Sequence, residues 1–216
     1  DMIERVPNDV GYYQIKAGDT EAIDYVVELA SQLPDDEVYA EIAELVDING
    51  LVNYLMPELW TGNWDWPQNN VKGFRDVNDG KFRFVLFDLD GAFSTSTPFV
   101  TFFGKQNYTF DSLHGFDHSL NKNMSGTRRN GEIKFVTLFK NMLKNETFRK
   151  KFIDTFCIFG SSIFQPSHVK RIIDDMSSYL STGGHVGPNG TANDIKNKFT
   201  LSYNNNMMNQ LKKIRF

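Results

Sequence analysis

"NWDWPQNNVKGFR", at residues 63–75, marks the point where the hydrophobic period of the chain changes. Before it, "DINGLVNYLMPELWTGN" repeats apolar residues at helical spacing, and Pro57 is expected to kink this helix. After it, "VKGFRDVNDGKFRFVLFDLD" alternates with a period of two, and the Asn-Asp-Gly sequence at 78–80 is typical of a hairpin turn. The stretch therefore predicts a polar loop between a helix and a β-hairpin near residues 70–89.

Helical spacing also dominates the rest of the chain. We therefore predict a mainly α fold of the α+β class, a helical domain with one β-hairpin at the site. Residues 1–18 are weakly patterned, and residues 91–131 are predicted to form a long irregular loop. The other helices are predicted at about 20–33, 36–46, 132–145 and 146–164, then from Pro166, and finally from Ala192 to the end of the chain.

Length and composition favour a single domain over residues 1–216. The net charge of -4 arises from well-mixed acidic and basic residues, so we expect no nucleic-acid partner. No run approaches the roughly 18 apolar residues that a membrane span needs. The one cysteine, Cys157, lies in an apolar run and is expected to be buried. The oligomeric state has no signal in the sequence.

Two aspartates follow the second strand of the predicted hairpin, in "FVLFDLDGAF". Alternation along a strand would place Asp88 and Asp90 on the same face, where two carboxylates can bind Mg²⁺ or another divalent ion. The competing interpretation is a strand that ends at Gly91 with two solvated carboxylates. The neighbouring polar loop favours the metal site.

The polar loop contributes an aspartate and an asparagine at a spacing found in protein kinases. Asp65 and Asn70 are five positions apart, and the hairpin then leads to Asp88. Phosphoryl transfer uses one aspartate to orient the acceptor hydroxyl, and an asparagine and a second aspartate to hold metal ions. This chain has these residue types in the same order. The motifs of P-loop enzymes, zincins and serine hydrolases do not occur.

Residues 45–93 resemble the CotH kinase family, the spore-coat-type atypical protein kinases. The resemblance rests on "GNWDWPQNN" at 62–70, on the phenylalanine-rich hairpin, and on the Asp-x-Asp sequence followed by glycine at 88–91. The segment "FVTLFKNMLKNETFRKKFIDTF", at 135–156, is similar to a helical motif of the same family. Together the similarity covers about residues 37–180, and it implies a domain that resembles the C-lobe of a protein kinase.

The resemblance implies a role for each polar residue of the site. Asp65 matches the catalytic-loop aspartate of the family, Asn70 its metal-side asparagine, and Asp88 its metal-binding aspartate. Asp90 would assist Asp88 or replace it as a metal ligand. The implied cofactors are Mg²⁺ or Mn²⁺ with ATP, while the residues that contact the nucleotide are not identified. Four further residues would shape and pack the loop: Asn63, Trp64, Trp66 and Asn69.

The implied activity is transfer of phosphate from ATP to Ser or Thr of a secreted, coat or surface protein. The implied location is extracellular, at the cell surface or in a coat. A kinase also needs a nucleotide-covering lobe with a phosphate-clamping lysine. Residues 1–40 have no Gly-x-Gly-x-x-Gly, and their only lysine, Lys16, is assigned to a loop or a short strand. We therefore expect a C-terminal portion of a longer kinase, with weak or no activity alone, in preference to a shortened relative that binds metal or ligand without transferring phosphate.

Two other functions stay open at this point. One is a non-catalytic module that uses the same fold for surface or coat assembly, because fold does not determine function. The other is a carbohydrate-associated protein of the cellulosome type. In that protein Trp60, Trp64 and Trp66 would stack on sugars, and Asp88 and Asp90 would act as paired carboxylates. Exposed tryptophan faces would favour sugars, and buried ones would favour phosphate chemistry.

Overall fold

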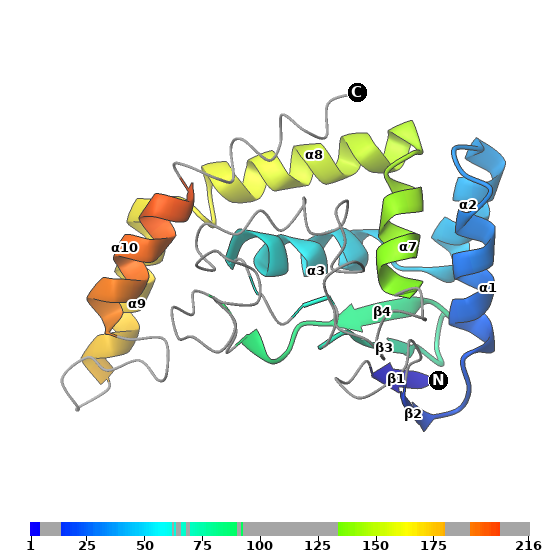
Figure 1. The fold of residues 1–216 in the computed structure, drawn as a ribbon, viewed down its shortest axis with the longest axis horizontal. Helices are drawn as coiled ribbons and strands as arrows, with labels where there is room; N and C mark the ends of the chain where they lie inside the picture. The colour runs from blue at the N-terminus through cyan, green and yellow to red at the C-terminus, as the bar shows by residue number, and fades with distance from the viewer. Residues whose placement is uncertain are drawn as a thin grey trace, which may run out of the picture. The chain divides into compact units, whose positions relative to one another are not determined.

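The computed structural model describes residues 1–4, 14–61, 63, 66–67, 70–89, 92, 134–179 and 191–203 (Figure 1). Within these residues the fold is mainly helical with one small antiparallel sheet, which confirms the predicted class. No described helix is long and apolar enough to cross a membrane. The strands are β1 (Met2–Glu4), β2 (Gln14–Ala17), β3 (Lys72–Arg75) and β4 (Phe82–Val85), and the helices are α1 (Glu21–Ala30), α2 (Asp36–Leu45), α3 (Ile48–Thr61), α7 (Lys134–Met142), α8 (Glu146–Ser161), α9 (Pro166–Tyr179) and α10 (Ala192–Ser202).

The sheet has the strand order β2-β1-β3-β4, and each neighbouring pair is antiparallel. β3 and β4 form the predicted hairpin, whose turn includes Gly80 at a φ of 73°. The prediction of a hairpin alone is wrong, because β1 and β2 extend the sheet on the other side of β3. β1 and β2 lie in the weakly patterned residues 1–18, where the sequence analysis predicted no pair of strands.

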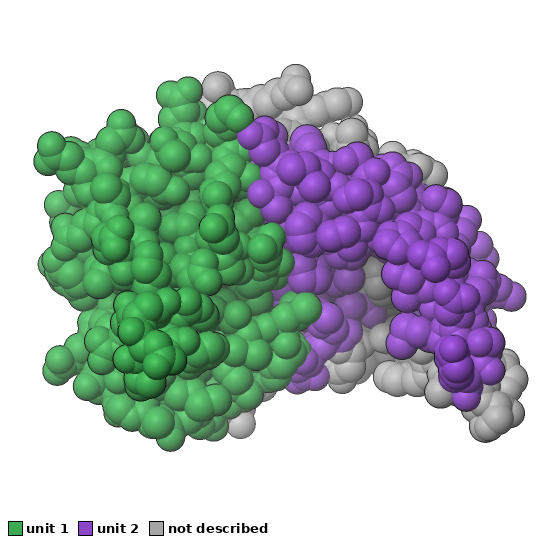
Figure 2. Space-filling view, turned by 180° about the vertical axis from the view of Figure 1, so that it is seen from behind, with its two compact units in different colours: residues 1–55, 65–87, 115–152 green, residues 56–64, 88–114, 153–216 purple. Residues whose placement is uncertain are grey.

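The chain divides into two compact units, coloured green and purple in Figure 2. The first unit takes its described residues from 1–55, 65–87 and 115–152. The second takes them from 56–64, 88–114 and 153–216. The sheet, α1, α2 and α7 therefore belong to the first unit, and α9 and α10 belong to the second. The predicted single domain over residues 1–216 stays a prediction.

Asn145 joins two helices of the first unit and is fully buried. Its amide nitrogen donates hydrogen bonds to the Asp36 carboxylate at 2.8 Å and to the carbonyl of Pro34 at 3.3 Å. Its side-chain oxygen accepts from the backbone N–H of Phe148 at 3.1 Å, which satisfies one free donor in the first turn of α8. The break between α7 and α8 therefore occurs where the sequence predicts it, near Asn145.

An aromatic cluster forms the centre of the second unit. The Trp60 ring stacks on Phe156 at 4.7 Å, on Tyr203 at 5.4 Å and on Phe164 at 5.6 Å between ring centroids. Gly160 lies under this ring, and a Cβ atom built there would be 2.6 Å from Cζ2 of Trp60. The absence of a side chain at Gly160 is therefore what allows Trp60 to pack against α8.

Cys157 is exposed, so the expectation of a buried thiol is wrong. The reason is the helical period of α8. Phe148, Phe152 and Phe156 are all buried and recur every four residues, so they define the inner face of the helix. Cys157 follows Phe156 by one position, about 100° further around the helix, and therefore faces outward. The apolar residues next to Cys157 in the sequence did not indicate that its side chain faces outward.

We predict that Gly160→Ala destabilises the protein by about 1–3 kcal/mol, because the added methyl group overlaps the Trp60 ring. Urea denaturation followed by tryptophan fluorescence measures the loss. Cys157→Ala, an exposed change in the same helix, is the matched control and should leave the denaturation midpoint nearly unchanged. Equal stability of the two variants would contradict the proposed packing.

Candidate functional site

A buried hydrogen-bonded pair links the end of α3 to the segment that follows β4. Glu58, in the last turns of α3, is fully buried, and Asn63 is 1% exposed. The Asn63 amide nitrogen donates to Oε2 of Glu58 at 2.8 Å and makes a longer contact of 3.4 Å with the backbone oxygen of Asp88. The backbone N–H of Asn63 also donates to the carbonyl of Glu58 at 3.2 Å. Three chain segments of the second unit therefore meet at Asn63.

The Glu58 carboxyl is held in its uncharged form over much of the neutral pH range. Its pKa is raised from 4.5 to about 8, mainly by burial and also by the negative charge of Asp88, while the hydrogen bond from Asn63 acts in the opposite direction. Its second oxygen, Oε1, is buried and has no hydrogen-bond partner among the described residues. A charged carboxylate in that position would be strongly unfavourable, so neutrality allows Glu58 to be buried.

Asp88 lies beyond the end of β4 in a left-handed backbone conformation. Its φ is 56°, and the next residue, Leu89, is in a short turn of 3₁₀ helix. The strand-alternation argument is therefore wrong for Asp88, because β4 ends at Val85. Asp88 is exposed to solvent, while its carbonyl faces the buried Asn63 amide. The backbone is anchored on one side and the residue remains accessible on the other.

Asn70 has the same unusual conformation, in the first unit, with a φ of 58° and an exposed fraction of 7%. Asn70 and Asp88 are the two non-glycine residues with positive φ in the described part of the chain. A left-handed conformation costs about 1–2 kcal/mol for most L-residues, and Asn and Asp tolerate it best. Both residues were predicted from the sequence as metal ligands. Strained backbone of this kind is concentrated at functional sites.

Trp66 anchors the part of the polar loop that leads to Asn70. It is 1% exposed, and its indole nitrogen donates to the Tyr54 hydroxyl at 2.7 Å. Its ring also makes edge contacts with Tyr54 and Phe135, at centroid distances of 6.2 and 5.7 Å. Val71, directly after Asn70, is fully buried. Asn70 is therefore flanked by two buried side chains from the same loop.

The structure describes four of the eight predicted site residues and brings Asn63 close to Asp88. Asp88 and Asn70 supply carboxylate and amide oxygens, which are suitable in kind for Mg²⁺ or Mn²⁺. No group of three or more His, Cys, Asp or Glu side chains with metal-binding geometry occurs among the described residues. The other four predicted site residues, Asp65, Trp64, Asn69 and Asp90, lie outside the described residues, as does nearly all of the predicted 91–131 loop.

The tryptophans bear on the carbohydrate hypothesis. Trp60 and Trp66 are each 1% exposed, so neither offers a face on which a sugar could stack. Trp64 lies outside the described residues. Two of the three aromatic platforms that this hypothesis requires are therefore not accessible.

Lys16 lies in the short strand β2, one of the two settings that the sequence suggests for it. Its ammonium group is 3.4 Å from the carboxylate of Glu4 on β1. Lys72, on β3, is 3.5 Å from the same carboxylate oxygen, and its ammonium lies 4.1 Å from the centre of the Phe87 ring. Glu4 therefore shares its one negative charge between two lysines on neighbouring strands.

The sequence analysis did not identify Glu58. A signal was present, because Glu58 is the one charged residue in "YLMPELW", and Leu55, Met56, Leu59 and Trp60 around it are all buried. A charged residue inside a buried helical run needs a partner or a shifted pKa. The partner, Asn63, was predicted only as a loop-shaping residue.

Comparison with protein families gave one match. A family model described as CotH kinase protein matches residues 5–213, nearly the whole chain. No curated protein and no solved structure matches the chain significantly. The predicted resemblance to a kinase C-lobe therefore has no support from a structural neighbour.

The raised pKa of Glu58 predicts a pH-dependent stability. The folded protein holds the Glu58 proton up to about pH 8, whereas the unfolded chain releases it near 4.5. The folded state therefore binds more protons between these values, and stability falls as pH rises through this window. Glu58→Gln keeps the oxygen that accepts from Asn63 and cannot ionise. We expect this variant to gain on the order of 3 kcal/mol relative to the natural chain between pH 5 and pH 8.

Urea denaturation at a series of pH values measures this gain. Glu44→Gln is the control, because the side chain of Glu44 is 85% exposed, and the difference between the two variants isolates the effect of burial. A constant difference in stability between Glu58→Gln and the natural chain at all pH values would show that Glu58 is not held neutral.

The conformation of Asp88 predicts a reversed preference between alanine and glycine. At a left-handed position glycine has no steric penalty and alanine does, so Asp88→Gly should be more stable than Asp88→Ala by about 1 kcal/mol. At Asp175, inside α9, the order should be the opposite by a similar amount. Thermal denaturation of the four variants tests whether glycine is the more stable replacement at Asp88 and alanine the more stable one at Asp175. Alanine as the more stable replacement at both positions would rule out the left-handed conformation.

Proposed function

The chain belongs to the CotH kinase family, and on this premise we propose that it carries the metal-binding and catalytic loops of an ATP-dependent protein kinase. The proposed reaction transfers the γ-phosphate of ATP to Ser or Thr of a secreted, coat or surface protein. The observation that carries this proposal is the conformation of Asp88. Its backbone is strained, its carbonyl contacts the Asn63 amide, and the residue itself is exposed. Packing alone gives no reason to maintain such strain.

Each proposed role follows from the chemistry of the side chain. The Asp88 carboxylate and the Asn70 amide oxygen would hold Mg²⁺ or Mn²⁺ with the ATP phosphates, and Asp90 would add a second carboxylate. The bound metal would neutralise charge on the phosphates. The Asp65 carboxylate would orient the acceptor hydroxyl and take its proton. The hydroxyl oxygen forms a bond to the γ-phosphorus while the bond to the bridging oxygen breaks, so ADP leaves with its electron pair.

Preorganisation is the contribution that the described residues support best. Asp88 would already be held in place before ATP binds, because its carbonyl contacts Asn63, which is hydrogen-bonded to the buried Glu58. Asn70 is likewise flanked by the buried residues Trp66 and Val71. Groups that are fixed before the reaction stabilise developing charge without paying a reorganisation cost at that moment.

The location proposed for this activity is extracellular, at the cell surface or in a spore coat. It rests on the family alone. The substrate would be a protein that presents Ser or Thr in an exposed segment, since a kinase site must reach the hydroxyl. A non-catalytic assembly module with the same fold is the competing function, and the binding experiment below separates the two.

We predict that the chain binds ATP in the presence of Mg²⁺ or Mn²⁺ and that Asp88→Ala weakens this binding by at least about tenfold, the loss typical even of outer-shell residues at metal sites. Isothermal titration calorimetry measures both affinities. Asp175→Ala, an exposed aspartate on α9, is the matched control and should bind as the natural chain does. Asp65→Asn should keep ATP binding, because Asp65 is assigned to the hydroxyl and not to the metal.

Two results would argue against the proposal. A folded chain that does not bind ATP with either metal would favour the assembly module. ATP binding that Asp88→Ala leaves intact would show that the nucleotide site, if present, does not use the residue assigned here.

A further inference from the structure

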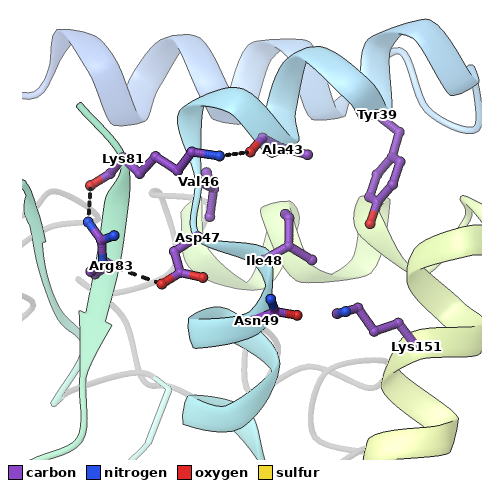
Figure 3. Close-up of a pocket in the computed structure, with 9 residues that line it drawn as sticks. All are labelled: Tyr39, Ala43, Val46, Asp47, Ile48, Asn49, Lys81, Arg83 and Lys151. Atoms are coloured by element: carbon purple, nitrogen blue, oxygen red, sulfur yellow. Dashed lines mark hydrogen bonds and ion pairs between the residues drawn. The ribbon is translucent and has the colours of Figure 1, made fainter. Parts of the chain in front are cut away.

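A polar cavity of about 320 Å³ lies within the first unit (Figure 3). Its lining residues come from α2, from the two residues between α2 and α3, from the first turn of α3, from β4 and the residue before it, and from α8. None of the residues assigned above to metal, ATP or the acceptor hydroxyl lines this cavity. Three apolar side chains form part of its wall: Ala43, Val46 and Ile48.

Two of the three cations at the cavity are already engaged. The Arg83 guanidinium donates to both carboxylate oxygens of Asp79, at 2.9 and 2.5 Å, and it lies 3.3 Å from Asp47 and 3.4 Å from Asp76. The Lys81 ammonium donates to the carbonyl of Ala43 in α2 at 2.7 Å, and it lies 4.0 Å from the Glu44 carboxylate, which balances its charge. Neither cation therefore offers a free charge to a ligand.

Three other side chains at the cavity have unused hydrogen-bond donors. They are the Tyr39 hydroxyl, the Asn49 amide and the Lys151 ammonium, and none of them makes a hydrogen bond or ion pair with another described residue. Figure 3 shows the Lys151 ammonium directed toward Asn49, and the Tyr39 hydroxyl directed into the same space. Burial raises the pKa of Tyr39, so its hydroxyl remains a donor at neutral pH. The three donors come from three different helices.

The charge balance selects the kind of group that these donors can hold. One unpaired ammonium and two neutral donors match a single negative charge with two oxygens. The Asp47 carboxylate, which is also at the cavity, would repel a second negative charge. A phosphate dianion is therefore a poorer match than a carboxylate, because the one guanidinium that could hold it is committed to three aspartates.

We propose that this cavity binds a carboxylate carried by a peptide, an Asp or Glu side chain whose oxygens are held by Lys151, Tyr39 and Asn49. The volume is near the lower end for ligand sites, which suits a side chain and not a whole nucleotide. The apolar residues at the cavity would contact the methylene groups of the same side chain. The cavity would then be a docking site for an acidic segment of a protein partner, and its occupancy does not depend on ATP or metal.

The test uses the 216-residue chain, labelled with ¹⁵N, and three small probes. These are N-acetylglutamate amide, its neutral analogue N-acetylglutamine amide, and N-acetylphosphoserine amide. We expect the glutamate probe to shift the NMR signals of the Asn49 side chain and of Ile48, with a Kd on the order of millimolar. The glutamine probe should leave these signals in place. Tighter binding of phosphoserine would overturn the choice of carboxylate over phosphate.

Variants identify the groups that hold the probe. Lys151→Gln should weaken glutamate binding roughly tenfold, the effect of losing one charged hydrogen bond. Lys150→Gln, the neighbouring lysine on α8 that does not line the cavity, should bind as the natural chain does. If Lys151→Gln does not fold, Tyr39→Phe removes one hydroxyl while keeping the ring, and should weaken binding several-fold. No shift with glutamate, an equal shift with glutamine, or unchanged binding in both cavity variants would overturn the proposal.

Discussion

The constraint on which the candidate site depends is the burial of a carboxyl group at the end of α3. Glu58 is surrounded by fully buried apolar residues, so it must be neutral and hydrogen-bonded to remain there. Asn63 satisfies one of its oxygens and uses the same amide group to contact the carbonyl of Asp88. The end of the helix, the start of the polar loop and the segment after β4 are thus connected through two side chains.

The positive φ angles of Asn70 and Asp88 are a second sign that these two positions are not arranged for stability alone. Each residue adopts a conformation that glycine would adopt at no cost, yet each retains a side chain whose oxygen can bind a metal ion. Neighbouring parts of the chain support both residues. Trp66 and Val71 are buried beside Asn70, and Asn63 contacts the backbone of Asp88. The strain is therefore distributed over well-packed surroundings, as is expected where function and stability compete.

The sequence predicts the helices well where a local signal is strong, as at Pro166, which begins α9, and at Asn145, which precedes α8. It fails where the deciding contact is distant. β1 joins the sheet by pairing with β3, about seventy residues away, as well as with β2, and Cys157 faces outward because three phenylalanines occupy the inner face of α8. The residue types of the site could be read from the order of Asp65, Asn70 and Asp88. The role of Glu58 could not, because it depends on a fold that brings Asn63 and Asp88 together.

The order of the strands also has a consequence for how the sheet assembles. The pairs β1–β2 and β3–β4 are each local in the sequence and can form early, whereas pairing β1 with β3 must close a loop of about seventy residues. Closing a loop of this length has a large entropic cost, so we expect the β1–β3 pairing to follow the two local pairs. Because synthesis proceeds from the N-terminus, β1 leaves the ribosome long before β3 does. Until β3 joins, the sheet around Ile3, whose side chain is fully buried in the finished fold, is incomplete.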